Sequence, residues 1–112
     1  MGDAMALLVV MYGMPKDAAV FDRYYHDIHV PMAKKVPGLK KYEISRGPVM
    51  TPAGPSSVHP SSRYLAAILH FDDMAAIQHA FFSTQEGQAA AADVAVFATG
   101  GAEILMFETI DA

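Results

Sequence analysis

Cysteine is absent from this chain of 112 residues, so neither a disulfide nor a thiolate metal site can form. The lack of cysteine is typical of proteins in a reducing compartment, and we expect a cytoplasmic location. Basic residues are few, with eight Lys and Arg against twelve Asp and Glu, and they are scattered along the chain. A formal charge of -4 without a basic stripe argues against nucleic acid as a partner.

Long hydrophobic runs are absent as well. The apolar run at residues 5–12 is far shorter than the roughly 20 residues needed to cross a bilayer, so we expect no membrane segment. The chain also lacks a Ser nucleophile elbow, a Gly-rich phosphate loop and a dinucleotide fingerprint, which disfavours covalent and nucleotide chemistry. Apolar residues, at 53%, are abundant enough for a single domain over residues 1–112 with its own core.

The first half of the chain predicts a helix that a proline interrupts. Asp17 is a suitable N-cap, and apolar residues follow it at helical spacing up to about His29. Pro31 has no backbone N–H to donate, so we expect the helix to break or kink there, before a short piece at 32–36.

Two further helices are predicted in the second half of the chain. Asp72 or Asp73 caps the first of them. Ser83 and Glu86 have the spacing of a capping box, which opens an alanine-rich helix that ends at Gly100.

Four runs of strand length complete the pattern, at residues 5–12, 39–46, 64–71 and 102–110. The order β-α-β-β-α-β predicts an α+β, ferredoxin-like fold. Both alternating faces of the first and third runs are apolar, but the helices can cover only one face of the sheet. The other face should meet the same face of a second copy, so we predict a homodimer through the sheet face. The segment 47–62 holds four prolines and is a candidate lid or dimer arm.

Tyr25 and His29 are the candidate catalytic residues. They are four apart, hence neighbours on one helix face, at the edge of the apolar arc. That arc comprises Val20, Phe21, Tyr24 and Ile28. An imidazole at this boundary, beside Pro31, could act as a general acid or base, with Tyr25 as hydrogen-bonding partner or second proton donor. The structural alternative is that His29 satisfies carbonyls freed by the proline and that Tyr25 is a core residue with a wet hydroxyl.

The remaining candidates are polar or aromatic residues around this pair. Asp22 could orient the His29 ring. His26 and His29 are three apart, but no third ligand has a recognised spacing, so we expect neither a metal nor a cofactor. His70 shares a strand face with Tyr64 and either pairs with a backbone carbonyl or lines a pocket with His29. The candidate substrate-binding residues are Tyr24, His70, Tyr12 and Tyr64, although a core or interface role is the default for Tyr12 and Tyr64.

A longer pattern joins these residues: Phe21, Tyr24, Tyr25, His29, Val30, Pro31, Pro37, Gly38, Leu39, Tyr42, Phe82, the stretch 83–87, Asp93 and Phe97. It covers nearly the whole chain and resembles the EthD family of dimeric α+β barrel proteins, named for ethyl tert-butyl ether degradation. The resemblance implies a ferredoxin-like protomer whose sheet pairs with a second sheet in a closed barrel. The wider superfamily includes lactone isomerases, polyketide cyclases, cofactor-independent monooxygenases and haem-using enzymes, so the fold alone does not select a reaction.

Two functional hypotheses follow. The first is a cofactor-independent enzyme that moves protons on a small hydrophobic metabolite in a catabolic or polyketide-like pathway, by isomerisation, cyclisation or a related step. The second is a non-catalytic protein that binds a hydrophobic ligand or assists an oxygenase or ether-degradation system. Haem use is a third option, which absorbance during a haem titration would reveal.

Overall fold

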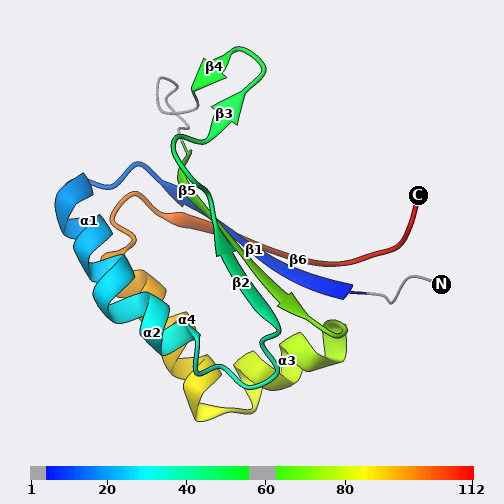
Figure 1. Cartoon of the computed structure of the whole chain (residues 1–112). Helices are drawn as coiled ribbons and strands as arrows, with labels where there is room; N and C mark the ends of the chain where they lie inside the picture. The colour runs from blue at the N-terminus through cyan, green and yellow to red at the C-terminus, as the bar shows by residue number, and fades with distance from the viewer. Residues whose placement is uncertain (1–4, 56–62) are drawn as a thin grey trace.

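A computed structural model describes residues 5–55 and 63–112 as a four-stranded antiparallel sheet with helices packed on one face (Figure 1). The strand order is β2-β5-β1-β6, which is the ferredoxin-like order and confirms the predicted α+β fold. The strands are β1 (Met5–Gly13), β2 (Lys41–Ile44), β5 (Arg63–Phe71) and β6 (Ala102–Thr109). All four predicted strands are present and differ from the prediction only at their ends.

The helix caps agree with the sequence at two of three positions. Asp17 caps α1 (Ala18–Tyr24), and Asp73 caps α3 (Met74–Phe82). The predicted capping box at Ser83 is wrong, because Thr84 caps α4 (Gln85–Phe97) and accepts from the Gly87 N–H at 3.0 Å. The Thr84 hydroxyl also donates to the Ala80 carbonyl of α3 at 2.5 Å, so a single side chain joins the end of α3 to the start of α4. Gly87 permits this crossing, since a Cβ there would overlap the Ala80 carbonyl.

The first helical segment continues through Pro31 instead of breaking. After α1 come a π-helical turn, η1 (Tyr25–His29), and then α2 (Val30–Ala33). The Val30 N–H donates to the Tyr25 carbonyl, five residues back, which widens the backbone just before the proline. The extra residue in the turn relieves the clash that a proline ring otherwise makes with the preceding turn. Of the two predicted alternatives, a break at Pro31 is therefore wrong, and α2 (Val30–Ala33) replaces the separate piece expected at 32–36.

The π-turn also changes which side chains are buried. Tyr25 and His29 are buried at 0% and 5% exposure, whereas Val20 and Ile28, assigned to the apolar arc, are exposed. A π-turn has more residues per turn than an α-helix. Residues four apart therefore lie more directly above each other in the π-turn than they do in an α-helix. The prediction that His29 lies half in solvent is therefore wrong.

The two faces of the sheet differ in how far they are covered. On β1 the side chains of Ala6, Leu8, Val10 and Tyr12 face the helices and are buried, while the alternate set on the other face is only partly buried. β6 lies at the edge, and its four central apolar side chains, Ile104, Leu105, Met106 and Phe107, are 43–49% exposed. The predicted second apolar face is thus present and uncovered within the described protomer.

The proline-rich segment contains a small hairpin. β3 (Met50–Thr51) pairs with β4 (Gly54–Pro55), and Figure 1 shows this hairpin projecting from one end of the sheet, away from the helices. Residues 56–62 lie outside the described part of the chain, so the role of 47–62 as a lid or dimer arm stays a prediction. No helix in the described ranges has the length and apolar character needed to span a membrane.

Candidate functional site

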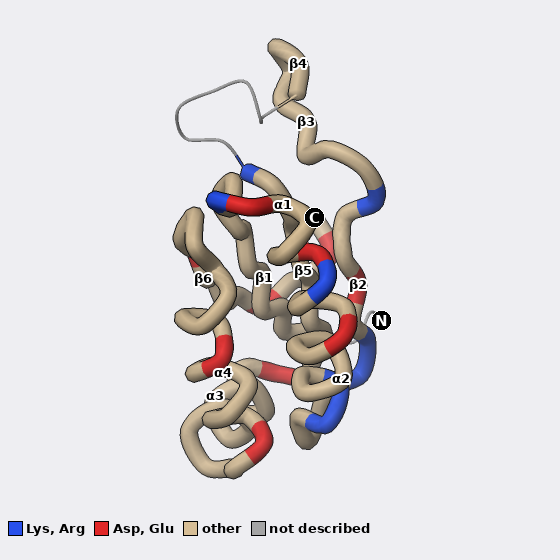
Figure 2. The backbone as a smooth tube through the Cα atoms, turned by 90° about the vertical axis from the view of Figure 1, so that its left-hand side faces the viewer, with Lys and Arg blue, Asp and Glu red and all other residues tan. Residues whose placement is uncertain are grey.

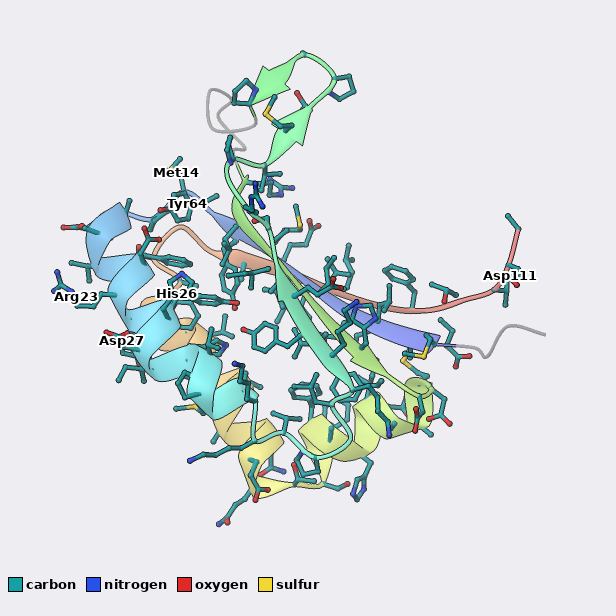
Figure 3. All side chains as sticks on the ribbon, viewed as in Figure 1. Met14, Arg23, His26, Asp27, Tyr64 and Asp111 are labelled. Atoms are coloured by element: carbon teal, nitrogen blue, oxygen red, sulfur yellow. The ribbon has the colours of Figure 1, made fainter. Side chains whose placement is uncertain are left out.

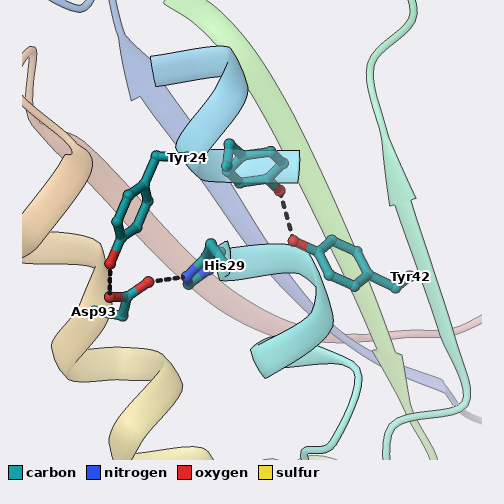
Figure 4. A network of polar contacts seen from close by, with 5 residues as sticks. Tyr24, His29, Tyr42 and Asp93 are labelled. Atoms are coloured by element: carbon teal, nitrogen blue, oxygen red, sulfur yellow. Dashed lines mark hydrogen bonds and ion pairs between the residues drawn. The ribbon is translucent and has the colours of Figure 1, made fainter. Parts of the chain in front are cut away.

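A buried histidine–aspartate pair connects the π-turn with α4. His29 Nδ1 lies 2.9 Å from Asp93 Oδ2, and the Tyr24 hydroxyl donates to Asp93 Oδ1 at 2.6 Å (Figure 4). The side chains of His29 and Asp93 are only 6% and 7% exposed. An ionised carboxylate can only accept hydrogen bonds, so Asp93 holds the proton of the imidazole on Nδ1 and leaves Nε2 with a lone pair.

The second ring nitrogen of His29, Nε2, makes no hydrogen bond among the described residues. Every buried side-chain nitrogen or oxygen among the described residues has a hydrogen-bond partner, and the hydrogen bond of His29 uses Nδ1. Nε2 therefore keeps some contact with solvent although the residue as a whole is buried. Phe97 and Tyr25 fix the plane of the imidazole, with ring centroids 4.7 and 5.5 Å from that of His29.

A pair of tyrosines lies beside this histidine. The hydroxyl groups of Tyr25 and Tyr42 are 2.6 Å apart (Figure 4). Tyr25 is fully buried, and the Tyr42 hydroxyl is the hydrogen-bond partner of its hydroxyl. Both hydroxyl groups are satisfied when the Tyr25 hydroxyl donates to Tyr42, which leaves the Tyr42 proton directed outward. Burial raises the pKa of both phenols, and the bond from Tyr25 partly offsets this for Tyr42. Both hydroxyls are thus neutral donors at physiological pH.

Other predicted site residues lie elsewhere. His70 is on the opposite sheet face from His29, because its neighbours Leu69 and Phe71 point into the core, so the two histidines share no pocket. Its Nε2 pairs with Glu43 Oε1 at 2.7 Å, not with a backbone carbonyl. Tyr12 is a core residue at 1% exposure.

Asp22 does not orient His29, contrary to the prediction. It accepts from the Tyr64 hydroxyl at 2.8 and 3.0 Å, while Asp93 holds the imidazole. Tyr64 reaches Phe21 on the helix side, which corrects its predicted place on the face of His70. The pairing of β1 with β5 is irregular at Tyr12, next to Tyr64, and this irregularity accounts for the change of face.

Besides a hollow of about 150 Å³ lined in part by Tyr24 and Phe97, two further hollows adjoin these residues. One of about 390 Å³ lies at the base of the hairpin, lined in part by Met14, Asp22 and Tyr64 (Figure 3). The other, of about 190 Å³, lies between the π-turn with α2 and strand β2, and Tyr42 lines it. It therefore adjoins Tyr42, whose hydroxyl contacts that of Tyr25.

A metal site between His26 and His29 finds no support in their surroundings. His29 Nδ1 faces Asp93, whereas His26 is exposed and packs edge-on against Tyr25. Among residues 5–55 and 63–112, no group of three or more His, Asp or Glu side chains could hold a metal ion. Arg23 and Asp27 point away from the sheet on the outer side of the helix (Figure 3).

Comparison with known proteins decides the family. Residues 14–101 match the sequence profile of the EthD domain. The chain belongs to the EthD family. An uncharacterized 11.0 kDa protein of Rhodococcus erythropolis, from the thcB-thcC intergenic region, is 37% identical over 101 residues, which span 90% of this chain and 91% of that protein. The crystal structure of an EthD family protein from Bacillus halodurans is 31% identical, covers 95% of this chain and 99% of its own, and has a TM-score of 0.81.

More distant solved structures share the fold alone. SnoaB, a cofactor-independent oxygenase from Streptomyces nogalater, is 13% identical with a TM-score of 0.61, covering 99% of this chain and 97% of its own. A dimeric ferredoxin-like protein of unknown function from Jannaschia is 18% identical with a TM-score of 0.64, covering 94% and 99%.

Two residues of this EthD domain were missed as site residues by sequence reasoning. Asp93 was noted only as part of the family pattern, yet it is an isolated acid on the apolar face of α4, three residues after Ala90 and four before Phe97. That isolation was the available signal, since a buried carboxylate needs a partner. Tyr42 gave a weaker signal, because in a short strand its side chain could have pointed to either face.

Proposed function

We propose that this EthD-family protein is a cofactor-independent enzyme that performs acid/base chemistry, such as an isomerisation or cyclisation, on a small hydrophobic carbonyl- or aromatic-bearing metabolite. The observation that carries the proposal is the 2.9 Å contact between His29 Nδ1 and Asp93, which orients the ring and leaves Nε2 as the base. Asp93 also stabilises the imidazolium that forms when Nε2 takes a proton. The Tyr24 hydroxyl holds the other carboxylate oxygen in place.

The proposed reaction needs no oxidant or co-reactant. Nε2 of His29 takes a proton from a carbon next to a carbonyl. The electron pair of the C–H bond forms a C=C bond, and the π pair of the carbonyl moves onto its oxygen, which gives an enolate. A neutral tyrosine hydroxyl of the Tyr25–Tyr42 pair hydrogen-bonds that oxygen. His29 then returns the proton to a different carbon, which completes an isomerisation. Alternatively, the enolate carbon attacks a second carbonyl, which closes a ring, and His29 gives its proton to the oxygen of that second carbonyl.

We further propose that the protomers pair through the uncovered sheet face. Leu105 and Phe107 of β6 continue the partly exposed row of β1, opposite Val9 and Leu7 respectively. A homodimer would cover this apolar face, which supports the proposal. The ferredoxin-like protein of unknown function from Jannaschia, which shares the fold, is also dimeric. A cytoplasmic location stays a prediction.

Deuterium incorporation tests the catalytic proposal without knowledge of the natural substrate. The protein is incubated in D2O with a panel of small carbonyl compounds and lactones, and mass spectrometry follows exchange at carbon. The key variant is His29→Asn, because the Asn amide can still donate to Asp93, whereas His29→Ala would leave a cavity and a buried Asp93 carboxylate without this donor. We expect exchange to fall by about 100-fold or more with a nearly unchanged melting temperature.

Two outcomes would contradict this proposal. Unchanged exchange in a folded His29→Asn variant would mean that another group moves the proton. Absence of exchange with every compound, together with saturable binding of hydrophobic ligands, would favour the non-catalytic binding or accessory role.

A further inference from the structure

A groove runs between the first helical segment and the edge strand β2. Its lining comprises His26, Val30, Lys34, Tyr42 and Ile44, and its volume is about 190 Å³. The helical residues recur every four positions and the strand residues every two, so each element presents one continuous face to the groove. The volume is below the roughly 300 Å³ of drug-sized sites and suits a ligand of about one ring.

The groove has an apolar floor and polar ends. Val30 and Ile44 are partly buried and pack against the core. The His26 ring lies edge-on to Tyr25, with centroids 5.6 Å apart, and its nitrogens make no hydrogen bond within the described ranges. A ring-shaped ligand can therefore lie over the apolar floor while donors at the rim bind a polar substituent.

The groove lies in the basic part of an acidic protein. Four of the eight basic residues fall at positions 34, 35, 40 and 41, and Figure 2 shows Lys and Arg gathered near α2 and β2. Lys40 pairs with Asp72 at 3.5 Å and Lys41 with Glu43 at 3.4 Å. Lys34, in contrast, has no carboxylate partner within residues 5–55 and 63–112. An ammonium group that lines a groove and lacks an internal partner favours an anionic ligand.

We propose that this groove binds the carboxylate of a small monocyclic organic acid. The Lys34 ammonium and a His26 ring N–H donate to the carboxylate, and Val30 and Ile44 contact the ring. The inference rests on the proposed function and deepens it by naming organic acids as the substrate class. With the carboxylate at Lys34, the rest of the ligand lies against Tyr42 and approaches the tyrosine pair beside His29.

Binding of benzoate, compared with its neutral analogue benzamide, tests this assignment. Both are titrated into the full-length ¹⁵N-labelled protein, and dissociation constants come from the amide chemical shifts. We expect the wild-type protein to prefer benzoate by about fivefold. Lys34→Gln should weaken benzoate binding by about three- to fivefold and leave benzamide unaffected. Lys35→Gln removes the same charge from a neighbouring residue that does not line the groove, and should change the affinity by less than about 1.5-fold.

Three results would overturn the inference: equal affinities for benzoate and benzamide, equal losses in the two lysine variants, or no saturable binding of benzoate. The readout does not depend on turnover, because His29→Asn should bind benzoate as the wild type does. Lys34-dependent binding without deuterium exchange would therefore contradict the catalytic proposal alone, and exchange without Lys34-dependent binding would contradict the groove assignment alone.

Discussion

Two histidine–carboxylate pairs of similar geometry lie on opposite faces of the same sheet. His29 and Asp93 are 2.9 Å apart with side chains 6% and 7% exposed, whereas His70 and Glu43 are 2.7 Å apart with side chains 20% and 45% exposed. Water competes for the exposed pair and screens its charges, but the buried pair has only protein partners. Contact distance alone therefore does not indicate what a pair does, because burial determines whether the carboxylate can fix the imidazole.

The surroundings of the two pairs differ in the same way. On the helix side, the π-turn, α4 and β2 bring together groups from distant parts of the chain and satisfy each of them. On the open side, the polar pair lies on β5 and β2, and apolar residues of β1 and β6 on the same face are without cover in the protomer. The first face carries the site that we propose for the reaction, and the second is the surface that we propose for the dimer.

The largest effect is expected from a charge placed on the open face of the sheet, which tests whether that face is the contact surface. Leu105→Asp should abolish the dimer, since a buried unpaired carboxylate costs several kcal/mol, and about 3 kcal/mol already raises a dissociation constant more than a hundredfold. Light scattering across a dilution series gives the molar mass. Val20→Asp, on the exposed side of α1, is the matched control and should stay dimeric. A dimeric Leu105→Asp variant would place the interface elsewhere.

Removing the buried carboxylate should produce the next largest effect. Asp93→Ala leaves both His29 Nδ1 and the Tyr24 hydroxyl without their acceptor, so the free energy of unfolding should fall by about 3 kcal/mol. Urea unfolding measures this loss. Glu43→Ala removes the carboxylate of the exposed pair and should have a much smaller effect, because water screens that pair. Equal losses in the two variants would remove the distinction between the pairs.

At alkaline pH, the buried tyrosine pair should affect the stability of the fold differently from exposed phenols. Burial raises the pKa of Tyr25 and Tyr42 above the unfolded value of about 10. Their contribution to stability is therefore complete below about pH 10 and is lost as pH rises above it. Tyr25→Phe should cost about 1 kcal/mol at pH 7 and make the fall in stability above pH 10 less steep. Denaturant melts at several pH values test this, and an unchanged slope would contradict it.

The smallest expected effect concerns the exposed pair. The hydrogen bond from His70 lowers the pKa of Glu43, so this pair stabilises the fold above the unfolded carboxyl value of about 4.5, and the contribution is lost as pH falls through the lowered value. NMR titration of the Glu43 carboxyl carbon should show this lowering, and His70→Asn should largely reverse it. If the variant titrates as the wild type does, the contact is absent in solution.

Local sequence signals predicted the elements well and the site only in part. Strand composition and the caps at Asp17 and Asp73 depend on neighbouring residues, which is why the ferredoxin-like order could be predicted. The π-turn could not, because ideal helical spacing does not indicate how the backbone accommodates Pro31. The missed residue Asp93 lies 64 positions from His29, and only the packing of α4 against the π-turn brings them together.

The protonation of the His29 ring tests the central claim most directly. Long-range ¹H–¹⁵N NMR, recorded at a pH at which the ring is neutral, distinguishes the two tautomers. We predict that His29 carries its proton on Nδ1, in the hydrogen bond to Asp93, with an unprotonated Nε2. A proton on Nε2 and none on Nδ1 would contradict the account, because the nitrogen assigned as the base would then have no lone pair.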